Sequence, residues 1–332
     1  MIKSLQGLRA LAMLGIFMFH AGLLIKGTFP VTFFFMLSGF VLYYSYSKKI
    51  NEFKLKENIY WIKNRMKKLY PIHIITFIMS IFIRWEWIKK FDINELFMKV
   101  LLNITLLQSL SKQSIFIFNG LSWFLSTTFI LYIITCPLIL VIKNIKRIRV
   151  KYLIIVLLVI QNIIVIINII YCYELNLYTS PFFRVFDFAL GMLVAKLFIS
   201  KNKNNINSKK YSFYEFLAII IFIFMYLLTL ITNINFQYGL NYYSPLFIFV
   251  LYVFAMEKGV ISKVLSINIL QKLAKLSFEF YMVHELILIL FRKVFLSLEY
   301  HWLVKNVIIA IPSFIISIIL AIILNRYVTN RN

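Results

Sequence analysis

Charged residues and cysteines are scarce in this chain, and each scarcity excludes a class of protein. Only 14% of the 332 residues are charged and 62% are hydrophobic, more apolar surface than a water-soluble domain can bury. The two cysteines, Cys136 and Cys172, show no CxxC or metal-ligand spacing, which argues against a disulfide scaffold and a zinc site. No cleavable signal peptide is visible, because the first apolar run contains Arg9 and another run follows at once.

Long apolar runs make up most of the chain, and their length fits a lipid bilayer. The hydrocarbon core is about 30 Å thick and holds no water, so a crossing segment must satisfy its own backbone hydrogen bonds as a helix. We therefore predict an all-α integral membrane protein with about ten transmembrane helices in one bundle, a single membrane domain over residues 1–332. The predicted spans are residues 8–25, 30–47, 69–84, 121–142, 150–171, 182–199, 214–232, 242–256, 278–296 and 303–325.

The strongly basic charge follows the predicted topology. A formal net charge of +24 is compatible with nucleic-acid binding, but its distribution argues otherwise. With the N-terminus placed inside, 26 of the 36 Lys and Arg residues fall in the inner connections, and the bias alternates without a break. Positively charged connections remain in the cytoplasm. We therefore predict that both termini are cytoplasmic and that the protein binds no nucleic acid.

One outer segment, residues 85–120, does not fit a simple loop. Its apolar residues recur at helical spacing, which favours an amphipathic helix, interfacial or re-entrant, on the extracytoplasmic side of the membrane. The alternative is an eleventh span, which the polar Asn103, Thr105 and Gln108 disfavour. The residues that carry the pattern are Leu96, Phe97, Val100, Leu101, Ile104 and Leu107.

The first span holds two ionisable residues, Arg9 and His20, and such residues inside a membrane are candidates for function. Eleven residues are three helical turns plus about 20°, so the two side chains share one face about 16.5 Å apart along the axis. A guanidinium at the inner surface can hold a phosphate. An imidazole, with a reference pKa of about 6.5, can take a proton at neutral pH. Taken singly, Arg9 is also compatible with a positive-inside anchor and His20 with a packing histidine.

Together with further motifs, this pair resembles acyltransferase family 3. The Arg-x10-His pattern is followed by an aromatic run, Phe34 to Phe40, that includes Ser38 and Gly39. The resemblance extends along nearly the whole chain, and the combination is specific although each motif alone is weak. The other matching motifs are Arg65-Met66-Lys67-Lys68-Leu69-Tyr70-Pro71, Trp123-Phe124-Leu125, Arg184-Val185-Phe186-Asp187-Phe188-Ala189-Leu190-Gly191 and Ser277-Phe278-Glu279-Phe280-Tyr281-Met282-Val283-His284.

The resemblance implies an activity. Members of the family are membrane acyltransferases that move an acyl group, usually acetyl, from coenzyme A to hydroxyls of extracytoplasmic glycans, here in a bacterial plasma membrane. It implies a catalytic role for His20 with Arg9, acetyl-coenzyme A as donor without a metal, and coenzyme A binding at Arg65, Lys68 and Arg9. Two features depart from the family pattern. Lys68 stands where the family has an Arg, so the charge is kept but the bidentate geometry of a guanidinium is lost. Thr128 stands at about the position where family members frequently have a Glu after the tryptophan motif.

The resemblance and the helix geometry together suggest a mechanism. Coenzyme A would bind at the cytoplasmic face, and its pantetheine arm would place the thioester beside His20. The acceptor hydroxyl would arrive from outside, and His20 would remove its proton as general base. A covalent acyl-His intermediate is the alternative. Trp123 and Tyr281 are candidate donors to the oxyanion.

Other candidates keep two readings each. The basic residues in 48–68 could attract coenzyme A phosphates or lipid headgroups. Arg184 and Asp187 could neutralise each other or touch an acceptor, and Ser38-Gly39 could let another helix approach closely or merely pack. His284 could belong to the site, by orienting a ligand or exchanging protons, or could merely pack. A transporter or flippase of lipid-linked sugars is the rival function, although it needs no basic cytoplasmic segment paired with a membrane histidine.

Overall fold

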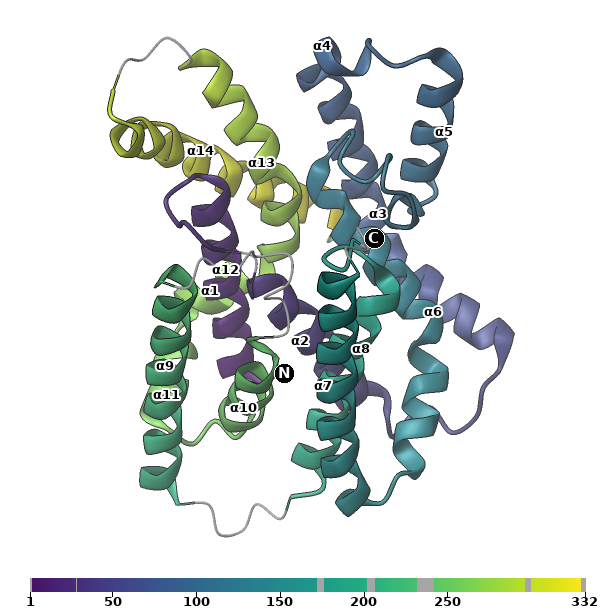
Figure 1. The fold of residues 1–332 in the computed structure, drawn as a ribbon, viewed down its shortest axis with the longest axis vertical. Coiled ribbons are helices and arrows are strands. Elements are labelled where there is room, and N and C mark those ends of the chain that lie inside the picture. The colour runs from purple at the N-terminus through teal and green to yellow at the C-terminus, as the bar shows by residue number, and fades with distance from the viewer. Residues whose placement is uncertain are drawn as a thin grey trace. The chain divides into compact units, whose positions relative to one another are not determined.

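The computed structural model describes residues 2–27, 29–171, 176–201, 207–231, 242–295 and 300–329. Over these residues the protein is 82% helix and has no strand, which confirms the predicted all-α class (Figure 1). The chain forms two compact units, which we describe separately. Unit 1 contains residues 1–12, 28–55 and 131–274, and unit 2 contains residues 13–27, 56–130 and 275–332.

A helix occupies each predicted span. Six helical segments are long and apolar enough to cross a membrane: Phe29–Tyr46, Leu55–Ile83, Gly120–Asn144, Arg147–Ile170, Ser208–Ile231 and Trp302–Thr329. The protein is therefore a multi-pass membrane protein, whereas the number of ten crossings stays a prediction. The ten helices in the predicted spans are α1 (Lys3–His20), α2 (Phe29–Tyr46), α3 (Leu55–Ile83), α6 (Trp123–Asn144), α7 (Arg147–Ile170), α8 (Pro181–Ile199), α9 (Ser208–Ile231), α10 (Ser244–Ala255), α13 (Ser277–Val294) and α14 (Trp302–Leu324).

Shorter elements connect these helices. They are α4 (Trp85–Ile88), α5 (Ile93–Ile104), α11 (Val260–Leu265), α12 (Asn268–Lys275), the 3-10 turns η1 (Gln108–Leu110) and η2 (Gly120–Ser122), and the π-helical turn η4 (Asn325–Thr329). Met1, residues 330–332, Cys172 and the ends of spans 214–232 and 278–296 lie outside the described residues. The cytoplasmic location of the termini and the single-domain organisation stay predictions.

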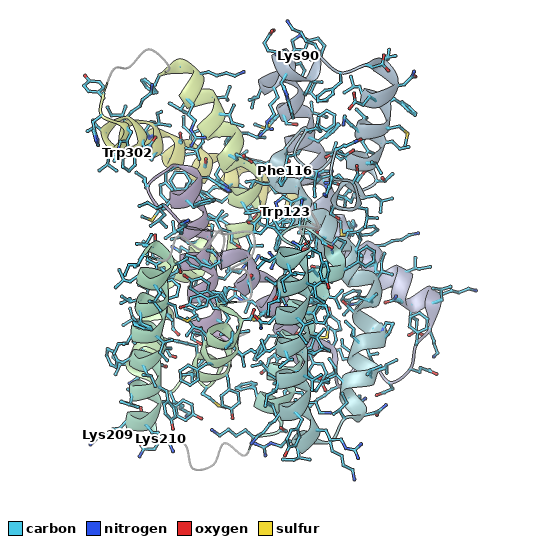
Figure 2. The ribbon with its side chains drawn as sticks, in the orientation of Figure 1. Lys90, Phe116, Trp123, Lys209, Lys210 and Trp302 are labelled. Carbon is cyan, nitrogen blue, oxygen red and sulfur yellow. The ribbon has the colours of Figure 1, made fainter. Side chains whose placement is uncertain are left out.

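Two of the long apolar helices, α7 and α9, combine buried polar side chains with exposed rows of apolar side chains. In α7, Gln161 and Asn168 are buried, whereas Ile155, Ile163 and Ile166 are exposed. The same arrangement is seen in α9, where a row of Phe and Ile side chains is exposed along the helix and Lys209 and Lys210 lie in its first turn (Figure 2). A water-soluble helix has the opposite arrangement, so these faces fit contact with lipid.

Close packing of α2 against α8 is the main feature of unit 1. A Cβ atom added to Gly39 would lie 1.9 Å from the carbonyl oxygen of Phe188, and one added to Gly191 would lie 1.9 Å from that of Met36. The two backbones therefore touch, as small residues allow in membrane helices. The predicted close approach at Ser38-Gly39 is thus seen at Gly39, while Ser38 is half-buried beside it.

Helix α3 in unit 2 is longer than its predicted span. The predicted span of residues 69–84 left Arg65 and Lys68 in a connection outside the helix, and this was wrong, because α3 begins at Leu55 and holds both residues. Lys and Arg are good helix formers, but their charge hides an amphipathic helical end from a search for apolar runs. Arg65 and Lys68 are thus three residues apart on one helix, and they project to neighbouring positions of its surface.

The outer amphipathic segment contains helix α5, with twelve residues against the about 20 that a span requires. Its polar Lys99 and Asn103 are buried, whereas Phe97 and Leu101 are exposed. Lys99 donates to the carbonyl oxygen of Gln113 at 2.9 Å. The helix is therefore amphipathic as predicted, with an apolar outer face, and too short to be an eleventh span.

Helix α1 ends earlier than predicted, at His20 instead of residue 25. The amide of Gly22 donates to the carbonyl of Phe19 at 3.0 Å, and that of Leu23 donates to Met18 at 2.8 Å. These two bonds form a Schellman motif, which needs a left-handed residue, and Gly22 has φ +74°. His20 is therefore the last residue of the helix.

Candidate functional site

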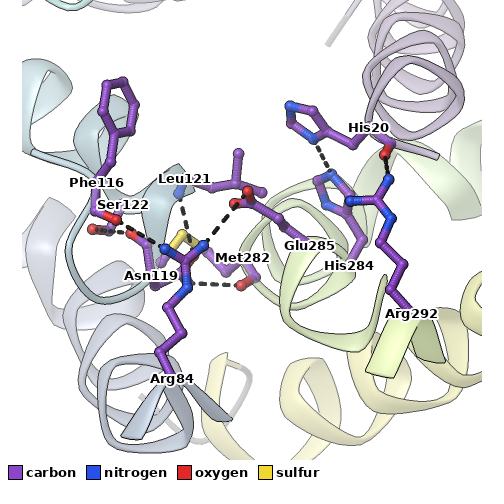
Figure 3. Close-up of polar contacts among 10 residues, drawn as sticks. All are labelled: His20, Arg84, Phe116, Asn119, Leu121, Ser122, Met282, His284, Glu285 and Arg292. Carbon is purple, nitrogen blue, oxygen red and sulfur yellow. Dashed lines mark hydrogen bonds and ion pairs between the residues drawn. The ribbon is translucent and has the colours of Figure 1, made fainter. Parts of the chain in front are cut away.

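Two histidines from distant parts of the chain meet in unit 2. His20 is the last residue of α1 and His284 lies in the middle of α13. The Nδ1 atom of His20 is 2.9 Å from the Nε2 atom of His284, and the two rings are nearly parallel at 14° (Figure 3). His284 is fully buried and His20 is half-buried, so the pair has one enclosed and one more accessible member.

The hydrogen bonds of this pair determine which nitrogen atoms carry protons. The Nδ1 atom of His284 is 3.1 Å from the carbonyl oxygen of Phe280, which can only accept, so Nδ1 is the donor. In neutral His284 the Nε2 atom is then an acceptor, and His20 donates to it from Nδ1. Neutral His20 consequently keeps an unprotonated Nε2 atom, whose lone pair can receive a proton.

Aromatic rings enclose the two histidines. Phe280 stacks on His284 with ring centroids 5.4 Å apart, and Phe17 packs edge-on at 6.0 Å. The ring of Tyr281 lies 5.9 Å from that of His284 and packs edge-on against Phe124. These aromatic side chains pack around the imidazole of His284, which is fully buried.

Charged side chains from α13 and from Arg84, the residue that follows α3, lie beside the pair. Arg292 donates to the backbone carbonyl of His20, and this bond satisfies an acceptor left open at the end of α1. Next to His284, Glu285 faces Arg84, with 3.7 Å between carboxylate oxygen and guanidinium nitrogen. Figure 3 shows Arg84, Glu285 and the turn at Asn119 together on one side of α13.

The predicted donor-binding residues lie on two helices. Arg9 is half-buried on α1, eleven residues before His20 as predicted. Arg65 is half-buried with its guanidinium 5.5 Å from the ring of Trp61, and Lys68 is exposed. Both α3 residues lie on the N-terminal half of a helix whose other end leads to Arg84.

The predicted pair Arg184 and Asp187 is buried in unit 1. One Nη atom of Arg184 lies 2.7 Å from the carboxylate of Asp187, and neither side chain is exposed. Arg184 also donates to Thr32 on α2, and Gln161 on α7 donates to Asp187. The ion pair lies within α8, and its hydrogen bonds to Thr32 and Gln161 connect α8 to α2 and α7.

The remaining candidates are buried. Trp123 begins α6 with its ring packed edge-on against Phe124 at 6.1 Å, and Tyr281 borders His284. Neither is placed by a contact at an oxyanion position, so their predicted role is untested. Over the described residues no cluster of three or more His, Cys, Asp or Glu side chains suits a metal ion.

Sequence reasoning did not single out Arg84, Arg292, Asn119 or Glu285 as site residues. Arg84 and Arg292 are among the basic residues of the predicted outer connections, and Glu285 directly follows His284 in the sequence. Their significance depends on the contact of α1 and α3 with α13, which sequence spacing does not reveal. The one available signal was a carboxylate directly after a histidine in the middle of an apolar stretch of α13.

Comparison with known proteins gives one result that bears on function. The family described as an acyltransferase domain, acyltransferase family 3, matches residues 2–326, nearly the whole chain. Comparisons with curated proteins and with solved structures gave no significant match.

Proposed function

Because the chain belongs to acyltransferase family 3, we propose that this membrane acyltransferase moves an acetyl group from cytoplasmic acetyl-coenzyme A to a hydroxyl of an extracytoplasmic glycan, in a bacterial plasma membrane. Membership in this family supports acyl transfer as the reaction. The donor, the acetyl group and the glycan are our proposal, as they were implied by the sequence motifs.

The observation that carries the proposal is the hydrogen-bonded series from Phe280 through His284 to His20. It leaves the Nε2 atom of His20 as a base whose ring is oriented by a second group. General bases in acyl transfer follow this arrangement of a base held by an orienting partner. His284 would thereby orient the base, a role that differs from the ligand-orienting, proton-exchanging and packing roles considered for it from the sequence.

The proposed reaction proceeds by direct transfer. The Nε2 atom of His20 removes the proton of the acceptor hydroxyl as its oxygen attacks the thioester carbonyl carbon. The tetrahedral intermediate collapses, the carbon–sulfur bond breaks, and the coenzyme A thiolate takes the proton from the imidazolium. The products are an O-acetyl ester and coenzyme A. Attack by Nε2 itself would give an acyl-His intermediate, and this route uses the same lone pair.

The proposed donor site uses the basic half of α3. Arg65 and Lys68 would hold the coenzyme A phosphates, since guanidinium and ammonium groups both bind phosphate. From Arg65 to Arg84 is nineteen residues, about 28 Å along a helix, which is the thickness of a hydrocarbon core. Arg9, about 16.5 Å before His20 along α1, would guide the pantetheine arm towards the base.

Nuclear magnetic resonance of the cell-surface polysaccharide tests the proposal. Cells without the gene should lose O-acetyl signals while exporting the glycan normally, and wild-type protein should restore them. His20→Ala should not restore them although it accumulates in the membrane, since loss of a general base typically lowers the rate 10²–10⁴-fold. A loss of glycan export instead would favour the transporter or flippase.

A further inference from the structure

The ion pair of Arg84 and Glu285 lies beside the candidate base and takes no part in the reaction described above. Arg84 follows α3, and Glu285 comes directly after His284 on α13. The turn that leads into η2 is held on α13 because Asn119 donates to the carbonyl oxygen of Met282 at 2.8 Å. Arg84 itself is fixed by donating to the carbonyl oxygen of Phe116 at 2.9 Å (Figure 3).

The two charged groups face each other without a hydrogen bond. Their separation of 3.7 Å exceeds hydrogen-bond length, and no hydrogen bond from another described residue reaches the Glu285 carboxylate. Removing a carboxylate from water without donors to replace the water is costly. The Nε atom of Arg84 and the Oε2 atom of Glu285 are buried without a hydrogen-bond partner among the described residues, while the side chains as wholes are 17% and 25% exposed. The pair therefore has hydrogen-bonding capacity that the protein leaves unused.

A glycine lies next to the pair. A Cβ atom at Gly120 would lie 3.1 Å from Oε2 of Glu285 and 3.6 Å from an Nη atom of Arg84. The residue of the turn that lies against both Arg84 and Glu285 is thus a glycine, which has no side-chain heavy atom. Any larger residue would press on the carboxylate, so Gly120 preserves the spacing of the pair.

The charges select the chemistry of a ligand. An anionic group would be repelled by Glu285 and a cationic group by Arg84. A neutral pair of adjacent hydroxyls can accept from the guanidinium and donate to the carboxylate at once. We propose that Arg84 and Glu285 form an acceptor subsite that binds two neighbouring hydroxyls of a neutral sugar, a role that rests on the proposed glycan acetyltransferase function. Glu285 directly follows His284 on α13, so the subsite would lie one helix position from the residue that orients the base.

Two-substrate kinetics with the full chain in membranes test this subsite. The donor is radiolabelled acetyl-coenzyme A, and the acceptor is surface polysaccharide from cells lacking the gene. Glu285→Gln and Arg84→Gln should each raise the KM for the polysaccharide about 10- to 100-fold, as expected for losing a hydrogen bond to a charged group. The KM for acetyl-coenzyme A should not change. The matched control is Glu86→Gln. Glu86 lies on the neighbouring helix α4, and its carboxylate forms an exposed ion pair with Lys89.

The outcomes separate this inference from the proposed function. If His20→Ala abolishes transfer while both pair variants keep the wild-type polysaccharide KM, the subsite is wrong and the proposed function stands. A pair that serves only to support the fold would instead lower kcat and protein abundance at unchanged polysaccharide KM, which also overturns the subsite. If His20→Ala transfers acetyl normally, the proposed function itself fails.

Discussion

At the scale of single residues, His284 owes its role to a backbone carbonyl. The carbonyl of Phe280 can only accept, so it fixes the proton of His284 on Nδ1 and turns Nε2 towards His20. The orienting group of the base is thus an uncharged imidazole. It needs no buried carboxylate, and this avoids the desolvation penalty of a charged group.

Replacing His284 should reduce the rate without removing the base. His284→Phe takes away the acceptor for the Nδ1 proton of His20, and a misplaced catalytic group costs about 10²-fold in rate. We expect a lower kcat with unchanged KM for acetyl-coenzyme A, and a smaller loss for His284→Gln, whose amide oxygen can accept. Initial rates in membranes measure both. If His284→Phe were inactive and His20→Ala active, the two roles would be exchanged.

Lys68 provides a test of the donor site. Lys68→Ala should raise the KM for acetyl-coenzyme A about 10- to 100-fold, because a charge-assisted contact contributes about 1.5–3 kcal/mol to binding. The effect on kcat should be smaller, as for a contact equally strong in ground and transition states. Lys68→Arg should preserve or lower the KM, since it restores the bidentate fork. If the KM for acetyl-coenzyme A were unchanged in both Lys68→Ala and Arg65→Ala, the basic half of α3 would not bind the donor. It would then serve only to set the orientation of the protein in the membrane.

The buried pair in unit 1 should behave differently, because its partners are all protein groups. Asp187→Ala leaves the Arg184 charge buried without its partner, and such a change costs about 3–5 kcal/mol of stability. The double variant Arg184→Met with Asp187→Leu should be less damaging than either single change. Thermal unfolding of the purified protein measures the difference. Additive losses, or wild-type stability with reduced acceptor binding, would contradict the structural role.

At the scale of elements, apolar runs located the helices but not their ends. Each predicted span contains a helix because a bilayer admits few alternatives. The end of α1 was misplaced by five residues, since a left-handed glycine stops the helix before the apolar run ends. The start of α3 was missed because Lys and Arg interrupt the apolar run without interrupting the helix.

Helix α5 allows a direct test of lipid contact. Its buried Lys99 and exposed Phe97 predict that the outer face of the helix lies in the membrane interface. A nitroxide label on Phe97→Cys, in a protein without Cys136 and Cys172, should collide more often with oxygen than with a water-soluble nickel complex. The exposed Gln113→Cys should show the reverse. Preference of both labels for the nickel complex would place α5 in water.

At the scale of the whole molecule, the orientation in the membrane rests on the basic connections. With native cysteines removed, an impermeant thiol reagent outside the cell should label Gln113→Cys and fail to label Lys209→Cys, because positively charged connections stay inside. Both side chains are exposed, so burial within the protein does not keep the reagent from either cysteine. Permeabilised cells should show labelling of both, as a control. The opposite pattern would put the basic half of α3 outside and overturn the donor side.

The candidate site was only partly accessible from the sequence. Arg9 and His20 could be placed on one face because eleven residues fix their relation within a helix. The contact of His20 with His284 joins positions 264 residues apart, and no local pattern encodes it. Arg84 and Glu285 were hidden for the same reason.

The reciprocal glycine contact between α2 and α8 has a mechanical consequence. Helices separated by interlocked side chains can slide over one another by switching rotamers. At Gly39 and Gly191 the backbone of each helix instead lies directly against a backbone carbonyl of the other helix. Neither glycine has a side chain that could change rotamer and let the helices slide. We expect the two helices to move as one rigid body, so that any opening needed to admit a large acceptor occurs at other helices.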